Sequence, residues 1–162
     1  MEASFLRLVP NPEESPAFVA FYAAINTAAD AAYVDVYNRK LADKKWLPRA
    51  TPHTQPVCME VNDLMYATMA AGGYEVDLVE GLGRRAHVFL EFPPEDVIVD
   101  ATYMQFVPKN KRTPNMPKVF VGTREQMIDY ARAHGVSESN LEIWKRENTR
   151  RKVHGSPHAS QA

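Results

Sequence analysis

The stretch that most constrains the fold is AHVFLEF-PPED-VIVDATY, residues 86–103, in which two short apolar runs flank a proline-containing turn. Both runs are rich in Val, Ile and aromatic residues, as paired β-strands are. A turn at residues 93–96 sets a register in which His87 faces Thr102. Asp100 then lies on the same face as His87, at the diagonal separation of roughly 7–8 Å that long side chains can bridge.

This register gives the hairpin two different faces. One face is entirely apolar and suits a hydrophobic core. The other face mixes polar with apolar side chains: His87, Phe89, Glu91, Ile98, Asp100 and Thr102. We therefore expect His87 and Asp100 to lie on a functional face rather than to interrupt a core.

A histidine beside a carboxylate suits nucleophilic catalysis, because the carboxylate fixes the imidazole tautomer and stabilises the imidazolium. The nucleophile that such a pair requires is offered by Cys58, the single cysteine. Pro56 and the helical repeat of VCMEVNDLMYATMAAGG place Cys58 in the first turn of a helix, where the helix dipole favours a thiolate. The sequence thus predicts a triad of Cys58, His87 and Asp100.

Each triad member also has an ordinary structural interpretation. A lone cysteine in an apolar helix is often a small buried hydrophobe, and a histidine on a strand often serves as a hydrogen-bonded structural residue. A non-catalytic binding module that keeps the same polar residues therefore remains an alternative.

The remaining patterns predict an α+β chain of helices and a small sheet. A helix begins at Pro16 and a second one ends before Gly72, while Thr123 and Gln126 form a capping box that opens a third helix. A meander of strands is expected at residues 74–81, 86–92 and 97–103, and a last charged helix at 141–152. We expect a single catalytic domain over residues 1–152 and a disordered tail over 153–162.

Composition narrows the classes of partner and cofactor. The net charge is −1 with Lys and Arg scattered along the chain, so a nucleic-acid partner is not expected. No apolar run reaches the roughly 18 residues that a membrane span needs, and no Sec-type signal is evident, which favours a cytoplasmic protein or one secreted without a Sec signal peptide. His134, His154 and His158 do not cluster with carboxylates at the spacing of metal ligands, so a metal site is not expected, and no other cofactor is expected either. The oligomeric state stays open.

Residues 54–106 resemble the transglutaminase-like branch of the papain-like cysteine enzymes. The resemblance is carried by a Cys that opens a helix, the small-residue stop AAGG, the strand AHVFLEF with its His, and the run VDATYMQF, which is similar to the family pattern D-x-T-x-x-Q-F. It implies an α+β fold with a papain-like/transglutaminase-like core, in which a helix bearing Cys58 packs on an antiparallel sheet bearing His87 and Asp100.

The resemblance also implies a cysteine-dependent acyl-transfer enzyme, a thiol hydrolase or amidase that acts on a peptide or protein amide through a thioester. Protease, glutamine deamidase and transglutaminase activities all share this chemistry. The backbone N–H of Cys58 and the amide of Gln55 are candidate oxyanion donors, and Gln105 is a candidate support for the site. An acyltransferase that uses a thioester donor is a further alternative.

Overall fold

The computed structural model describes residues 5–7, 16–42 and 58–152. Its centre is a six-stranded sheet in the order β1-β5-β4-β3-β2-β6. The strands are β1 (Phe5–Arg7), β2 (Asp77–Leu82), β3 (Ala86–Phe92), β4 (Val97–Asp100), β5 (Val119–Gly122) and β6 (Thr149–Arg151). The five strands from β5 to β6 pair antiparallel, and three of them, β2, β3 and β4, form the expected meander; β1 joins β5 in parallel at one edge.

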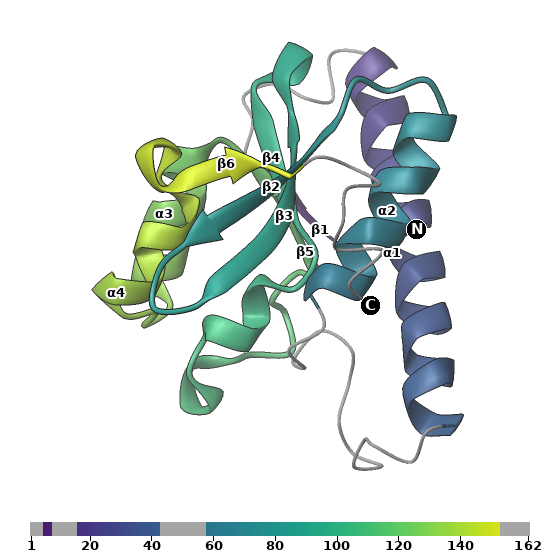
Figure 1. Ribbon diagram of the computed structural model, residues 1–162. Helices are drawn as coiled ribbons and strands as arrows, with labels where there is room; N and C mark the ends of the chain where they lie inside the picture. Colours follow the sequence, from purple (N-terminus) through teal and green to yellow (C-terminus); the bar gives the residue numbers. More distant parts are fainter. Residues whose placement is uncertain (1–4, 8–15, 43–57, 153–162) are drawn as a thin grey trace.

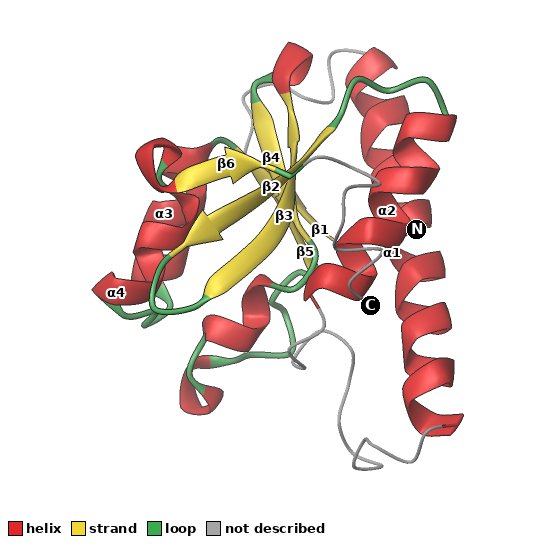
Figure 2. Cartoon of the chain, viewed as in Figure 1, coloured by secondary structure: helices red, strands yellow, loops and turns green. Residues whose placement is uncertain are grey.

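Helices cover both faces of the sheet, so the fold has three layers (Figures 1 and 2). On one face lie α1 (Pro16–Ala42) and α2 (Cys58–Ala71), and on the other lie α3 (Arg124–Ala133) and α4 (Glu138–Leu141). Short 3-10 helices connect these elements: η3 (Pro93–Glu95), η4 (Tyr103–Phe106), η5 (Lys109–Lys111), η6 (Glu142–Trp144) and η7 (Arg146–Asn148). The α+β class predicted from the sequence is confirmed.

The first two helices follow their sequence patterns. One stripe of α1 is buried against the sheet and α2, as its three- and four-residue spacing predicts: Phe21, Tyr22, Ile25, Ala29, Ala32, Tyr33 and Val36. The helix α2 ends before Gly72 and Gly73, and Gly73 adopts a positive φ of 88°, which favours glycine at a helix C-terminus. The capping box of Thr123 and Gln126 is present at the start of α3.

The hairpin of β3 and β4 has the predicted register. Phe92 pairs with Val97 and Leu90 pairs with Val99. The turn between them contains η3 and closes at Asp96, which adopts the left-handed conformation with φ 54°. Asp tolerates this conformation better than most residues, because its short polar side chain can bond locally.

The expectation that one face of this hairpin is not a core is wrong. The face that carries His87 also carries Phe89 and Ile98, which are fully buried in a second hydrophobic cluster beneath α3, η4 and η6. His87, Asp100 and Thr102 are themselves fully buried. The sheet therefore separates two hydrophobic cores, and the polar pair lies inside the second.

The predicted helix at 141–152 is also wrong. The chain there forms the end of α4, two 3-10 turns and the strand β6, which pairs antiparallel with β2. Lys145 has extended backbone angles that interrupt any helix. Ion pairs from Arg150 to Glu80 and from Arg151 to Asp77 accompany the pairing of the two strands. These contacts join segments that are distant in the sequence, so a local pattern does not reveal them.

In the part of the chain that the structure describes, none of the helices combines the length and the apolar character that crossing a bilayer demands. The predicted tail at 153–162 and the candidate oxyanion donor Gln55 lie outside the described residues.

Candidate functional site

The centre of the candidate site is an ion pair or hydrogen bond between His87 on β3 and Asp100 at the end of β4. His87 Nε2 lies 2.7 Å from Asp100 Oδ2, and both side chains are fully buried. The short distance is typical of a charge-assisted hydrogen bond. The hairpin register therefore brings together the two residues that the sequence pattern predicted to meet.

Two further donors hold the Asp100 carboxylate. The indole Nε1–H of Trp144 donates to Oδ2 at 2.8 Å, and the backbone N–H of Thr102 donates to Oδ1 at 3.0 Å. With His87, three groups bind this carboxylate, which offsets the cost of burying it. Trp144 was not predicted as a site residue, because it lies 44 positions from Asp100 and no local pattern links the two.

Aromatic rings enclose the His87 imidazole. The Phe106 ring packs edge-on against it with centroids 4.8 Å apart, and the Trp144 ring does so at 6.2 Å. Gln105 Nε2 lies 3.5 Å from His87 Nδ1 and donates to Thr102 O at 3.0 Å. The imidazole is thus fixed in orientation, with Nε2 toward Asp100 and Nδ1 on the side of Gln105.

Cys58 is the first residue of α2 and so lies in its first turn, as predicted; the position of its side chain is not among those described. One turn later, Asn62 Nδ2 donates to Val88 O at 3.0 Å, so this part of α2 lies beside β3 next to His87. β3 directs Val88 toward α2 and His87 toward the second core, so α2 and the imidazole lie on opposite faces of the sheet. The thiol can therefore contact the imidazole only around the end of the sheet.

Buried tyrosines complete the surroundings of Asp100. Burial raises the pKa of Tyr33 well above 10.0, and the charge of Asp100 adds to the effect. Burial also raises the pKa of Tyr103, with Tyr130 contributing next. Both phenols remain protonated and act as donors: Tyr33 toward the carbonyls of Ala101 and Lys118, and Tyr103 to the carbonyl of Pro117.

Close backbone packing brings Trp144 to the carboxylate. A Cβ atom at Gly81 would lie 2.0 Å from Ile143 O, and one at Gly83 would lie 2.9 Å from Ser139 O. The absence of side chains at both glycines lets the segment from α4 to η6 lie directly on β2 and its turn. This approach sets the position of the residue that follows Ile143, which is Trp144.

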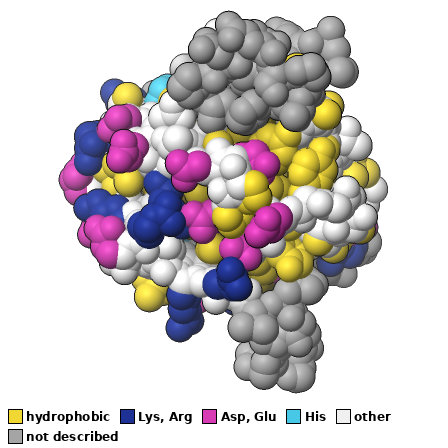
Figure 3. Space-filling view, turned by 90° about the horizontal axis from the view of Figure 1, so that it is seen from above, with side chains coloured by type: hydrophobic (Ala, Val, Ile, Leu, Met, Phe, Trp, Pro, Cys, Tyr) yellow, Lys and Arg dark blue, Asp and Glu magenta, His cyan; other side chains and the backbone are white. Residues whose placement is uncertain are grey.

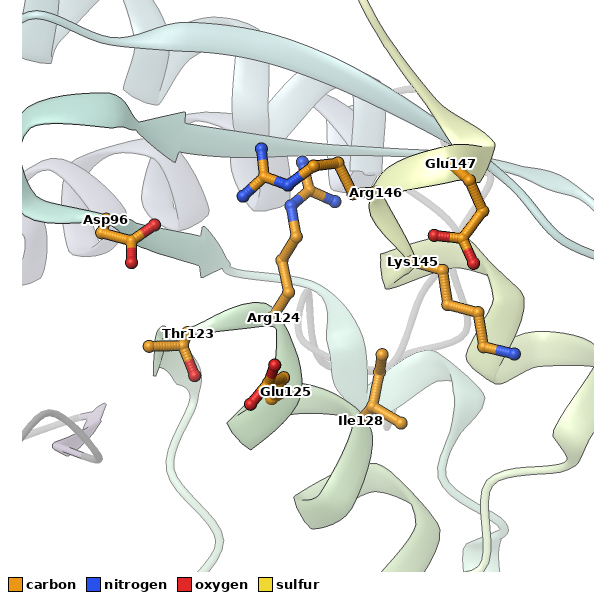
Figure 4. A pocket seen from close by; sticks show the side chains of 8 residues that line it. All are labelled: Asp96, Thr123, Arg124, Glu125, Ile128, Lys145, Arg146 and Glu147. Atoms are coloured by element: carbon orange, nitrogen blue, oxygen red, sulfur yellow. The ribbon is translucent and has the colours of Figure 1, made fainter.

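A separate hollow of about 360 Å³ lies at the other end of the hairpin, near the β3–β4 turn. Figure 4 shows the guanidinium groups of Arg124 and Arg146 next to each other in its wall, and both contact Glu91 Oε2, at 3.1 Å and 3.4 Å. Its lining contains no Cys or His: Asp96, Thr123, Arg124, Glu125, Ile128, Lys145, Arg146 and Glu147. The hollow therefore offers neither the thiol nor the imidazole of the predicted triad.

The chemistry available at the His87 end is that of a base held by a carboxylate. Within the described ranges, no three His, Cys, Asp or Glu side chains gather in a way that could hold a metal ion. An imidazole oriented by Asp100 can accept a proton at its second nitrogen and return it.

Comparisons with protein-family models, with characterised proteins and with solved structures found no match to this chain.

Proposed function

We propose that this protein is a cysteine-dependent acyl-transfer enzyme that acts on a peptide or protein amide, with Cys58 as nucleophile and His87 and Asp100 as its base pair. The observation that carries the proposal is the 2.7 Å bond between two fully buried side chains, His87 and Asp100. A papain-like or transglutaminase-like core is part of the proposal, and the start of α2 at Cys58 supports it.

In the proposed reaction the Cys58 thiolate attacks the carbonyl carbon of the amide and forms a C–S bond. The C–N bond then breaks, and the departing amine takes a proton from the His87 imidazolium, which Asp100 stabilises. Water or a second amine attacks the resulting thioester, gives its proton to His87 and releases the thiolate. Hydrolysis, glutamine deamidation and transamidation differ in the amide that enters and the nucleophile that resolves the thioester.

The location of Asn62 supports an approach of Cys58 to His87 around the end of the sheet, because α2 and His87 lie on opposite faces of β3. Residues four apart lie on one side of a helix, and Asn62 is bonded to the β3 strand at Val88. The connection from the end of α2 to the start of β2 fixes the direction in which α2 runs along β3. Because β2 begins opposite Glu91 and ends opposite Ala86, the C-terminal end of α2 lies toward Glu91. The N-terminal turn of α2 is therefore at the same end of β3 as His87.

The rate of thiol alkylation tests the base pair. A free cysteine, with a pKa of about 8.5, is only about 3% thiolate at pH 7, so an activated Cys58 should react with iodoacetamide at least about tenfold faster than a free thiol. His87→Ala should remove this excess rate. His134→Ala is the matched control, because His134 lies at the C-terminal end of α3, where its Nδ1 is bonded to Tyr130 O, and it should leave the rate unchanged.

The products of a peptide library identify the reaction. Wild type and Cys58→Ala are incubated with the same library, with and without a primary amine, and the peptides are weighed. Deamidation adds about 1 Da, hydrolysis creates new termini, and transamidation adds the mass of the amine with loss of ammonia. An acyl adduct on Cys58 formed from a thioester donor alone would instead indicate an acyltransferase.

A non-catalytic binding module is the second candidate, and the complete burial of His87 and Asp100 favours it. In that function the His–Asp–Trp network stabilises the second core and no substrate reaches the imidazole. Alkylation of Cys58 at the rate of a free thiol, equal in wild type and His87→Ala, supports this candidate and contradicts the enzyme.

A further inference from the structure

Cationic side chains without a carboxylate partner gather at the end of the sheet that carries His87. Among the Lys and Arg side chains that the structure describes, six form no ion pair: Arg84, Arg85, Lys109, Lys111, Arg112 and Lys118. The others are paired with Asp or Glu: Arg39, Arg124, Arg132, Lys145, Arg146, Arg150, Arg151 and Lys152. The six are here called the basic rim.

The strand register attaches both segments that carry the rim to one end of the sheet. Arg84 and Arg85 form the turn that joins β2 to β3, two residues before His87. The other four lie between the end of β4, at Asp100, and the start of β5. Figure 1 shows both segments on the lower side of the sheet, opposite the β3–β4 turn.

One segment of the basic rim follows directly in the sequence after residues of the candidate site. Gln105 and Phe106 contact the His87 imidazole, and Lys109 follows them in the same connection. The two segments of the rim, GLGRRA (81–86) and ATYMQFVPKNKRTPNMPK (101–118), contain no Asp or Glu. Five of the six rim residues are exposed, and only Arg112 is partly buried, where its Nε donates to Val107 O.

The opposite end of the molecule has a different charge pattern. Glu95 and Asp96 lie in the β3–β4 turn and Glu125 lies at the start of α3. On the face seen from above, acidic and basic side chains lie next to one another (Figure 3). Since the chain as a whole has a net charge of −1, the positive charge of the rim is a local feature and not a property of the whole surface.

We propose that the basic rim binds an acidic segment of the substrate polypeptide, rich in Asp and Glu, and so delivers a neighbouring amide to the site. This inference rests on the proposed function for the reaction itself. Unpaired surface cations attract an oppositely charged partner and raise its local concentration. A polypeptide is favoured over a nucleic acid because the acyl-transfer chemistry beside the rim requires a carbonyl carbon.

The test is binding of a fluorescein-labelled peptide of ten residues, alternating Glu and Gly, to the full chain in the Cys58→Ala form. This variant cannot form a thioester, so binding is measured apart from catalysis. The rim variant replaces Arg84, Arg85, Lys109 and Lys111 by Gln. The matched control replaces Arg39, Arg132, Arg150 and Arg151 by Gln, which removes the same charge from cations that are largely exposed but paired.

We expect the rim variant to lose at least about tenfold in affinity and the control to lose less than about twofold, with binding in both weakening as salt rises. Thermal melts check that each variant is folded, and an Arg84→Gln/Arg85→Gln double variant is the smaller change. Equal losses in rim and control variants overturn the proposal, as does tighter binding of a ten-nucleotide single strand than of the peptide. If the rim binds the peptide but wild type modifies no amide, the proposed binding surface is supported and the proposed enzymatic activity is contradicted.

Discussion

Replacing Trp144 by Phe tests whether the indole N–H stabilises the buried carboxylate of Asp100. The substitution keeps an aromatic ring in the second core and removes the donor that lies 2.8 Å from Oδ2. A hydrogen bond to a charged group contributes about 1.5–3 kcal/mol. Roughly 40 Å³ of lost side-chain volume adds about 1 kcal/mol at about 24 cal/mol per Å³. We expect the free energy of unfolding to fall by about 2.5–4 kcal/mol.

The assay is urea unfolding of a double-mutant cycle that combines Trp144→Phe with Asp100→Asn. The neutral amide keeps the shape of the carboxylate but binds the indole less strongly, so we expect a coupling energy of about 1 kcal/mol or more. Met127→Ala is the control, because Met127 is fully buried in the same cluster and its side chain has no donor. A coupling below about 0.5 kcal/mol for Trp144, or an equal one for Met127, would refute the assignment.

Three further measurements test other contacts. Gly81→Ala should cost more than about 3 kcal/mol in urea unfolding, because its Cβ would clash with Ile143 O; Gly72→Ala, which meets ordinary contacts of 3.4 Å or more, should cost less than about 1 kcal/mol. Since the folded state holds the Tyr33 proton that the unfolded state releases above pH 10.0, wild-type stability should fall there, and Tyr33→Phe should make this slope shallower by about 1.4 kcal/mol per pH unit. Asn62→Ala should cost about 1–3 kcal/mol by leaving a carbonyl of β3 unsatisfied, and an unchanged urea midpoint would contradict that bond.

The sequence pattern predicted the part of the site that depends on local pairing. The alternation of two short strands around the turn at 93–96 is enough to set His87 near Asp100, because side-chain direction in a strand has a period of two. The place of Cys58 in the first turn of α2 was predicted for a similar reason, since proline and the helical repeat are local signals. Both predictions are confirmed by the backbone of the structure.

The parts that could not be predicted depend on contacts between distant segments. Trp144 reaches Asp100 only because the chain folds back over glycines 81 and 83. The same segment hides the His87 face, which a hairpin alone would leave open, and so converts it into a core. Residues 149–151 become a strand through pairing with β2, against a charged local sequence that resembles a helix.

The hydrogen bond of Trp144 has a consequence for the order in which the chain matures during synthesis. The hairpin with His87 and Asp100 leaves the ribosome more than 40 residues before the indole that completes the carboxylate's set of donors. Until the last segment packs on β2, the second core is open, and water can donate a hydrogen bond to the carboxylate in place of the indole. Release of the C-terminal part of the chain is thus the step that seals the His–Asp pair, and a nascent chain halted before residue 144 would present that pair to solvent.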